Sequence, residues 1–247
     1  MKLSRYKHDS PFSYALGATL SYELLKTQPN LIRRAFLRPN IKHGADLEDI
    51  IAKFKDQDVE IIESTKAFNV LGAKDTCLLI TEFTKPSAKI DNYPETSHIV
   101  LVNPSDAGNL GTIIRSAAAF NYKNIAIITP AVDPYDPKTI RASMGALFHV
   151  NIQTFPSFGK YLEQNGRHQD QTRQLFSFML LPDAQKLNAT KPTSKFYSII
   201  FGNEATGLDS HFAENTTAVY IPQSPSVDSL NLSVAVSIAM YHFSSAL

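Results

Sequence analysis

The stretch IIFGNEATGLDS, residues 199–210, decides the fold of this chain. A short apolar strand runs directly into Gly-Asn-Glu, which begins at Gly202, and a second glycine follows at position 207. Glycine lacks a Cβ, so such a loop can adopt unusual backbone conformations and let a ligand approach the main chain. The stretch therefore predicts a buried strand whose carboxyl end carries a binding loop. An ordinary turn, in which Glu204 caps a following helix, is the alternative.

The composition is that of a soluble globular protein. Of the 247 residues, 43% are hydrophobic and 19% are charged, which allows one large domain or two small ones. The formal net charge of +1 provides no global basic field, so a nucleic-acid site would have to be local. A single cysteine, Cys77, excludes an internal disulfide and favours a reducing compartment. No apolar run is long enough for a membrane span, which predicts a cytoplasmic protein without membrane association.

Two α/β regions flank a polar linker with two prolines, TKPSAKIDNYPETS at 84–97. We expect a small domain over 1–90 and a larger one over 91–247. In the first domain, leucine spacing predicts a helix over 14–26, and three strands are expected at LIRRAFL, VEIIES and CLLITEF. The second domain has six candidate strands, namely HIVLVN, NIAIIT, HVNIQTF, QLFSFML, YSIIFG and AVYIP. Their short, branched, apolar sequences predict a parallel sheet that is covered on both faces.

Another loop at a strand end is NPSDAGNLGTIIRSAAAF, at 103–120. Gly108 and Gly111 predict a tight turn into a helix that carries Arg115 near its start. A guanidinium group there could hold a phosphate together with the free N–H groups of the helix. The alternative is a glycine turn followed by a surface arginine.

A third loop lies in IPQSPSVDSLNLSVAVSIAM, at 221–240. Ser229 or Asn231 could cap the last helix, with or without a chemical role. That helix, expected over 229–243, is apolar nearly all the way round, so it must be buried in the core or against another subunit.

Together, and in this order, the three loops resemble the three motifs of the TrmH-like branch of the SPOUT superfamily. This branch contains RNA 2′-O-ribose methyltransferases that use S-adenosyl-L-methionine. The segment IRASMGALFHV (140–150) also resembles one that such proteins carry between the first and second motifs. The matching residues are Asn109, Gly111, Arg115 and Ala117 in the first motif, Gly202, Asn203, Glu204, Gly207 and Leu208 in the second, and Ile221, Pro222, Ser229, Leu230, Asn231, Ser233, Val234 and Ala235 in the third.

The resemblance implies an α/β fold in which the parallel sheet ends in a deep C-terminal trefoil knot. It also implies a homodimer formed through the catalytic domain. More weakly, the first region resembles the small α/β RNA-binding domain that precedes many such domains. Its candidate phosphate contacts are Arg33, Arg34, Arg38 and Lys42. A solvated basic face is the alternative interpretation of these four residues.

The resemblance also implies roles for individual residues. The catalytic group would be Arg115, Ser229 and Asn231, and the cofactor-binding residues would be Gly202, Asn203, Glu204, Gly207, Ile221, Pro222 and Leu230. Asn109 and Arg115 would contact RNA, and no residue cluster has metal-ligand spacing. Glu204 would organise the loops or the dimer rather than transfer a proton. A guanidinium stays protonated, so we expect Arg115 to act electrostatically rather than as the general base that has been proposed for it in the family.

Departures from the family pattern and competing functions complete the sequence picture. Gln223 and Pro225 stand where the third motif often has Met and Gly, and proline removes one backbone donor. A non-catalytic RNA-binding protein is an alternative, either because GNLG (108–111) resembles the GXXG loop of KH domains or as a methyltransferase relative that has lost its activity. A hydrolase using Asp106 or Glu204 with Ser229 lacks a nucleophile elbow. Whether the RNA is tRNA or rRNA stays open.

Overall fold

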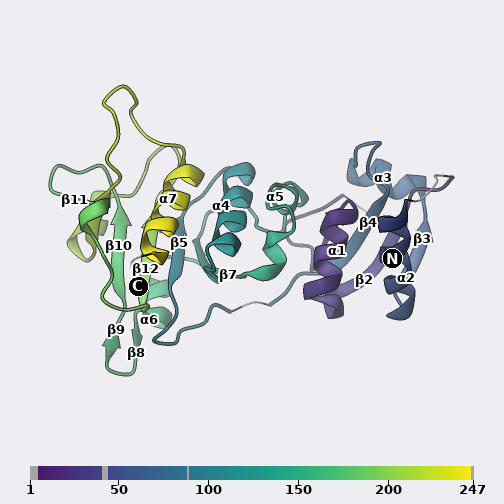
Figure 1. The fold of residues 1–247 in the computed structure, drawn as a ribbon, viewed down its shortest axis with the longest axis horizontal. Coiled ribbons are helices and arrows are strands. Elements are labelled where there is room, and N and C mark those ends of the chain that lie inside the picture. The colour runs from purple at the N-terminus through teal and green to yellow at the C-terminus, as the bar shows by residue number, and fades with distance from the viewer. Residues whose placement is uncertain (1–4, 41–43, 88, 246–247) are drawn as a thin grey trace. The chain divides into compact units, whose positions relative to one another are not determined.

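The computed structural model describes residues 5–40, 44–87 and 89–245. They form two compact units, one made of residues 1–87 and 133–149 and the other of 88–132 and 150–247 (Figure 1). Segment 133–149 therefore belongs to the first unit, although the sequence places it within the expected domain 91–247. Its assignment depends on tertiary packing, which local sequence patterns do not report. No described helix is both long and apolar enough to cross a membrane.

A mixed four-stranded sheet, in the order β1-β4-β2-β3, forms the centre of the first unit. Strand β4 is antiparallel to β1 and β2, while β3 is parallel to β2. The strands are β1 (Phe12–Leu16), β2 (Ile32–Leu37), β3 (Glu60–Glu63) and β4 (Leu79–Thr84). The helices are α1 (Ala18–Thr27), α2 (Ala45–Asp56), α3 (Thr65–Leu71) and α5 (Pro137–Ala142), with short 3-10 turns at Pro29–Leu31 and Ala146–His149.

The helix predicted over 14–26 is wrong in its first part. Residues 12–16 form β1, and α1 begins only at Ala18. Between them, Gly17 has a φ of 118°, which an L side chain rarely adopts and which ends the strand. Leu20 and Leu24 are buried in α1 as the leucine spacing predicts. Residues 12–16 are a strand because they pair along their whole length with β4, antiparallel.

Seven parallel strands form the sheet of the second unit, in the order β11-β13-β10-β12-β5-β6-β7. They are β5 (His98–Val102), β6 (Asn124–Ile128), β7 (Asn151–Phe155), β10 (Gln174–Phe178), β11 (Gln185–Lys186), β12 (Tyr197–Phe201) and β13 (Thr217–Tyr220). The predicted parallel sheet is confirmed, and β11 is an additional short edge strand. A small antiparallel hairpin joins β8 (Arg167–His168) and β9 (Gln171–Thr172).

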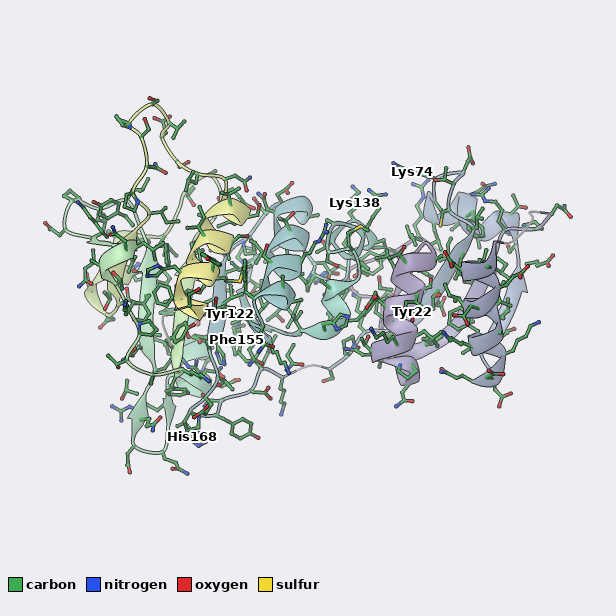
Figure 2. The ribbon with its side chains drawn as sticks, in the orientation of Figure 1. Tyr22, Lys74, Tyr122, Lys138, Phe155 and His168 are labelled. Atoms are coloured by element: carbon green, nitrogen blue, oxygen red, sulfur yellow. The ribbon has the colours of Figure 1, made fainter. Side chains whose placement is uncertain are left out.

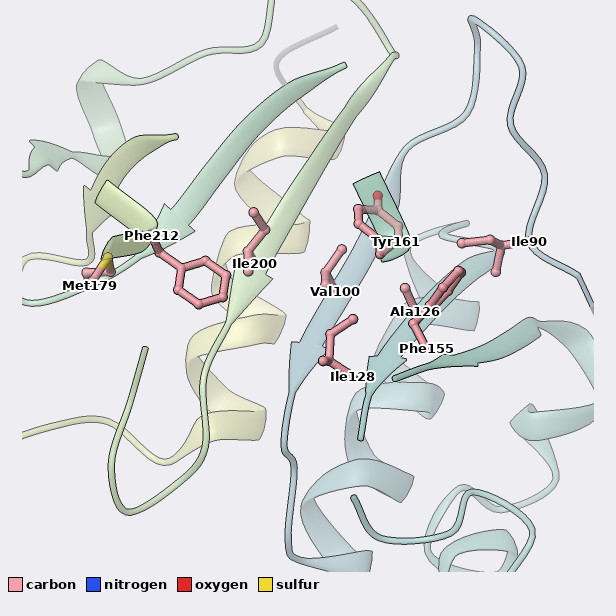
Figure 3. Packing of buried hydrophobic residues seen from close by; sticks show 9 residues of the cluster. All are labelled: Ile90, Val100, Ala126, Ile128, Phe155, Tyr161, Met179, Ile200 and Phe212. Atoms are coloured by element: carbon pink, nitrogen blue, oxygen red, sulfur yellow. The ribbon is translucent and has the colours of Figure 1, made fainter. Parts of the chain in front are cut away.

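Both faces of the parallel sheet are covered. Val100, Ala126 and Ile200 belong to one buried cluster that also contains Tyr161 and Phe212 (Figure 3). The helix α7, in pale yellow, lies behind the strands that carry this cluster. The helices of this unit are α4 (Ala107–Ala119), α6 (Phe158–Asn165) and α7 (Leu232–Ser244), with 3-10 turns at Leu187–Ala189 and Ser210–Glu214. Helices α4 and α7 pack against each other.

Candidate active site

A pocket of about 390 Å³ opens beyond the carboxyl ends of β10, β12 and β13. In parallel α/β sheets, ligands bind beyond these strand ends, in cavities of about 300–1,000 Å³. The chain supplies the lining from three segments that are far apart in sequence. The lining residues are 178–181, 201–208, 219–221, 223, 229, 230, 232 and 235. The second and third predicted loops therefore meet in one cavity.

Gly202 is required by the crowding of its own loop. A Cβ at this position would lie 2.1 Å from the carbonyl carbon and oxygen of Gly207 and 2.4 Å from the nitrogen of Leu208. The loop closes on itself because Asn203 and Gly207 exchange two backbone hydrogen bonds, of 3.2 and 2.9 Å. Gly207 has a φ of 67°, in the left-handed region that favours glycine. The two glycines are therefore required by the close packing of the loop's own backbone, whether or not a ligand is bound.

Asn203 ties this loop to the end of the neighbouring strand β5. Its Nδ2 donates to the carbonyl of Asn103 at 2.8 Å. Its Oδ1 accepts from the backbone N–H groups of Ala205 and Thr206, at 2.9 and 3.3 Å. One side chain therefore fixes both the turn itself and its position beside the loop after β5.

Glu204 anchors the same loop to the start of α4. Its carboxylate accepts from Ser105 N at 3.0 Å, Ser105 Oγ at 2.8 Å, Asp106 N at 3.2 Å and Asn109 Nδ2 at 3.3 Å. Partial burial acts to raise the pKa of Glu204, but the hydrogen bonds to its charged form outweigh it and lower the pKa below the ordinary value. Glu204 is therefore a charged structural anchor, and its contacts do not suit proton transfer.

The first predicted loop is organised differently from the sequence expectation. Helix α4 begins at Ala107, and the Asp106 side chain caps it by accepting from Asn109 N at 2.7 Å. Gly108 and Gly111 lie inside the helix, so the predicted glycine turn is wrong. For the same reason GNLG is not a loop of the KH type. A capping aspartate makes two glycines tolerable in the first turns of a helix.

Arg115 lies about two turns into α4, not at its start. Of the first N–H groups of the helix, that of Asn109 is bonded to the Asp106 side chain, while Glu204 accepts from the N–H of Asp106, the residue before the helix. The phosphate site that combines Arg115 with the N–H groups at the helix start stays a prediction. The Arg115 side chain is exposed, and it has no hydrogen-bond or ion-pair partner among the described residues.

Asn231 is the N-cap of α7 and connects it to α4. Its Oδ1 accepts from the N–H and hydroxyl of Ser233, at 2.9 and 2.7 Å. Its Nδ2 donates to Asn109 Oδ1 at 3.0 Å. Asn109 thus bridges Asn231 and Glu204, and both polar atoms of its side chain are used within the chain. The three motifs form one hydrogen-bonded network.

Of the residues expected in the site, seven line the pocket, namely Gly202, Asn203, Glu204, Gly207, Ile221, Ser229 and Leu230. Pro222, Asn109, Arg115 and Asn231 are not among its lining residues. Gln223 does line the pocket, and its Nε2 donates to the carbonyl of Asp228 at 3.2 Å, inside its own loop.

Sequence reasoning missed the wall that follows β10. Met179, Leu180 and Leu181 line the pocket, and Leu180 is 61% exposed. The available signal was the apolar run FMLL, which continues beyond the end of the strand into a polar segment. Next to them, the rings of Phe178 and Phe201 stack with centroids 4.3 Å apart. One side of the pocket is therefore apolar and partly aromatic.

The arginines expected to contact RNA are engaged inside the first unit. Arg33 Nε lies 3.1 Å from Glu82 Oε1, and Arg34 Nη2 lies 3.0 Å from Glu82 Oε2. Arg38 donates to the carbonyl of Cys77 at 3.1 Å. Glu82 is fully buried in β4, so the first two arginines neutralise a buried carboxylate. The side chain of Arg33 is still 39% exposed. Lys42 lies outside the described residues.

The fold, the loop geometry and the motifs define the class of this protein. A profile of the SpoU rRNA Methylase family matches residues 96–241, and the chain belongs to this family. The resemblance seen in the three loops is thereby confirmed.

Relatives extend the comparison. The chain is 27% identical over 235 residues to the 23S rRNA (guanosine(2553)-2′-O)-methyltransferase RlmP of Bacillus subtilis, which covers 92% of this chain and 86% of that protein. It is 36% identical over 148 residues to an uncharacterized tRNA/rRNA methyltransferase of Synechocystis, covering 58% of this chain but only 51% of that protein.

Solved structures share the fold. The SpoU methyltransferase AviRb from Streptomyces viridochromogenes, in complex with AdoMet, superposes with a TM-score of 0.82 at 21% identity, covering 95% of this chain and 90% of that one. An AdoMet-bound rRNA methyltransferase from Sinorhizobium meliloti gives a TM-score of 0.78 at 23% identity, covering 94% of this chain and 86% of that one.

Proposed function

We propose that this chain is an S-adenosyl-L-methionine-dependent methyltransferase that acts on a ribose 2′-hydroxyl of RNA. The observation that carries the proposal is the meeting of two motif loops in one pocket, with the first motif bonded to both. Membership of the SpoU rRNA Methylase family supports ribosomal RNA as the substrate, with tRNA as the second candidate. We also propose that the protein acts in the cytoplasm, a reducing compartment in which its single cysteine, Cys77, would stay a free thiol.

The pocket fits the methyl donor chemically. Met179, Leu181 and Leu230 offer apolar contacts for an adenine ring. The backbone of 202–207 lines the pocket, so its main chain lies where a nucleoside could contact it. Few side-chain charges face the cavity, which suits a ligand whose adenosine part is neutral. We assign Gly202, Ile221 and Leu230 as the principal donor contacts.

When bound, S-adenosyl-L-methionine supplies a methyl group on a positively charged sulfur, and the carbon–sulfur bond breaks as the oxygen–carbon bond forms. A ribose 2′-hydroxyl is a poor nucleophile until its proton is removed. The protein must therefore align the oxygen with the methyl group and favour the alkoxide. Alignment alone can supply up to about 7–11 kcal/mol of the barrier.

We assign the second task to Arg115. Its guanidinium group is exposed on α4 and has no partner in the part of the chain that the structure describes, so it is available to the RNA. Close to the reacting nucleotide, its positive charge would stabilise the developing alkoxide and hold a phosphate. It would not accept the proton, because guanidinium remains protonated, and the proton would leave to solvent. Ser229, at the pocket wall, would orient the ribose, and Asn231 would hold the start of α7 in place.

We also propose that the protein works as a homodimer that pairs through α7. Val234, Ile238 and Tyr241 follow one face of this helix and are 47%, 38% and 63% exposed. The opposite face is buried in the same unit. An apolar stripe of this kind on a surface helix is typical of a protein–protein interface. The deep trefoil knot of SPOUT proteins is the topology we propose for the segment from β12 to α7.

The first unit is proposed to hold the RNA. Arg33 is the best placed of its arginines, because it is partly exposed while Glu82 fixes its guanidinium group. Arg34 and Arg38 are more deeply engaged with the protein, with side chains 17% and 15% exposed. They would contribute mainly by shaping the surface that Arg33 presents.

Two measurements test the proposal. Isothermal titration calorimetry should detect S-adenosyl-L-methionine binding to the purified chain, whereas a purely RNA-binding module should give no heat. Ribosomal RNA from cells that lack the protein should then be incubated with the chain and the donor. Mass spectrometry should find a new 2′-O-methylated nucleotide. Methylation on a base, or no donor binding, would refute the assignment.

A further inference from the structure

The second unit contains a buried arginine, Arg173, whose hydrogen-bond partners do not line the pocket. Arg173, directly before β10, is 2% exposed and makes no ion pair among the described residues. Burial lowers the pKa of Arg173 to about 10. Its ring partner is Phe196, 4.0 Å from the guanidinium carbon. A buried charge without a carboxylate is costly, so its neutral partners must compensate well.

Those partners are oxygens from separate segments. Arg173 Nε donates to the carbonyl of Asn165 at 2.8 Å, and Nη1 donates to those of Thr96 and Tyr197 at 2.7 and 3.0 Å. Nη2 donates to Asn92 Oδ1 at 3.2 Å. The guanidinium group thereby ties the linker to α6 and β12. The linker after residue 88 is fixed to the second unit, although its composition predicts an irregular connection.

Asn92 connects Arg173 to the hairpin β8–β9 through its own hydrogen bonds. While its Oδ1 accepts from Arg173, its Nδ2 donates to the carbonyls of Gln164 and Arg167, at 2.9 and 3.0 Å. The residue after Asn92 is Tyr93, and the residue after Arg167 is His168. The bond between Asn92 and Arg167 therefore brings two aromatic side chains together at the surface.

The two rings form a pair in which Tyr93 is exposed and His168 is half-buried. Tyr93 and His168 lie edge to face, with centroids 6.0 Å apart and planes at 63°. Tyr93 is 62% exposed, one of the most exposed large side chains described. Figure 2 labels His168 on the hairpin, at the end of the second unit that is remote from the pocket loops. Because buried contacts already fix the backbone beside the rings, binding would have to order only their side chains.

Charge near the pair is balanced. Arg167 is exposed beside it, and Asp170 lies in the turn of the same hairpin. Glu95 in the linker lies 3.9 Å from Lys195, and Glu163 pairs with Lys160 at 2.7 Å. A strongly basic patch is thus missing from this described surface. Stacking, rather than attraction of phosphates, is the chemistry that these residues offer.

We propose that Tyr93 and His168 form a stacking platform for an unpaired base of the RNA substrate. Proteins recognise single-stranded RNA by stacking bases on tyrosine, histidine and arginine side chains. Arg167 can cover the same base with its guanidinium plane or contact the adjoining phosphate. The proposal rests on the proposed function only for the identity of the RNA as substrate. It adds a contact that is remote from the chemistry and specific to unpaired nucleotides.

The test compares single variants of the full chain in binding a fluorescein-labelled oligouridine, followed by fluorescence anisotropy. Loss of one stacked base corresponds to a rise in Kd of about 5- to 150-fold. Tyr93→Ala and His168→Ala should each show a rise in this range. Tyr93→Phe should keep the wild-type Kd, and so should Gln171→Ala, an exposed change on the same hairpin.

Three outcomes would overturn the platform. The first is wild-type affinity in both alanine variants, the second is no oligouridine binding by the wild-type chain, and the third is equal weakening by Gln171→Ala. Oligouridine duplexed with oligoadenosine should bind without any Tyr93 dependence. An equal loss of affinity for the duplex in Tyr93→Ala would also contradict base stacking. Binding of S-adenosyl-L-methionine to the wild-type chain is measured in parallel. If the chain does not bind this donor, the methyltransferase assignment fails, whatever the result with oligouridine.

Discussion

Ser105 holds Glu204 with two hydrogen bonds, one from its backbone N–H at 3.0 Å and one from its hydroxyl at 2.8 Å. The two residues are 99 positions apart in the sequence, yet they follow the adjacent parallel strands β5 and β12. This contact connects the loop that precedes α4 to the loop that lines the pocket. The shape of the pocket therefore depends on a residue outside its lining.

Replacing Ser105 with alanine should weaken donor binding. The variant loses one of the bonds to a charged carboxylate, and such bonds contribute about 1.5–3 kcal/mol. We expect the Kd for S-adenosyl-L-methionine to rise about tenfold or more in calorimetry, with a smaller effect on turnover at saturating donor. Ser105→Thr keeps the hydroxyl and should stay close to wild type. An unchanged Kd in Ser105→Ala would show that the loop holds its shape without this bond.

Alanine at Gly202 should be far more damaging than alanine at Gly207. At position 202 a Cβ would overlap backbone atoms at 2.1 Å, which cannot move aside as a side chain can. At position 207 there is nothing within 4 Å, and the cost is the φ of 67°, about 1–2 kcal/mol. Gly202→Ala should abolish donor binding, while Gly207→Ala should reduce it only modestly. Equal effects in thermal unfolding and calorimetry would contradict the crowding argument.

Arg115→Ala should separate chemistry from folding. The side chain is exposed and unpaired among the described residues, so the free energy of unfolding should change by less than about 0.5 kcal/mol. The donor Kd should be unchanged as well. Methyl transfer should fall about 100- to 1,000-fold, the usual cost of removing one electrostatic group from a reaction site. Arg115→Lys should recover part of the rate. Full turnover in Arg115→Ala would remove this residue from the mechanism.

A charge on the exposed face of α7 should dissociate the proposed dimer. Ile238 is 38% exposed in the single chain, so glutamate there should leave the fold intact. Buried in a dimer, the same carboxylate would lose its hydration without a partner. Light scattering after gel filtration should give a dimer for the wild type and a monomer for Ile238→Glu. Lys160→Glu, on α6, serves as the charge control. A wild-type monomer would rule out the dimer.

His98 should make the second unit sensitive to acid. Burial, together with the nearby charge of Arg173, lowers the pKa of His98 to about 3 from its ordinary value of 6.5. Between these values the unfolded chain binds a proton that the folded chain does not, so stability should fall as the pH falls from 6.5 towards 3. The slope is at most about 1.4 kcal/mol per pH unit. In His98→Gln the free energy of unfolding, measured with urea between pH 6.5 and 3, should depend less steeply on pH than in the wild type. An identical slope in both proteins would contradict it.

The sequence predicts the parallel sheet of the second unit well because its strands are short, apolar and buried on both faces. Ile99, Ile125 and Ile199 are all fully buried, which leaves little ambiguity in the pattern. The start of α1 was mistaken because Leu16 fits the helical spacing of Leu20 and Leu24 while belonging to a strand. Periodicity over one turn cannot distinguish these cases; the φ of Gly17 decides them.

For the candidate site, the sequence could predict that the motif loops lie near one another. It could not predict which hydrogen bonds join them. Glu204 could be expected near the pocket, whereas its clamp by Ser105 depends on the pairing of β5 with β12. The position of Arg115 was misjudged because an aspartate cap lets α4 start before its glycines. The arginines of the first unit could not be recognised as partners of Glu82 without the register of β2 and β4.

Segment 133–149 has a consequence for the modularity of this protein. The chain leaves the second unit after β6, contributes α5 and Phe148 to the first unit, and returns for β7. The ring of Phe148 packs edge to face on that of Phe83, 5.3 Å away. A gene fusion or truncation with a single cut near residue 90 would therefore separate the first unit from segment 133–149, which carries α5 and Phe148. During its evolution, the chain could exchange its N-terminal module only if this excursion changed with it.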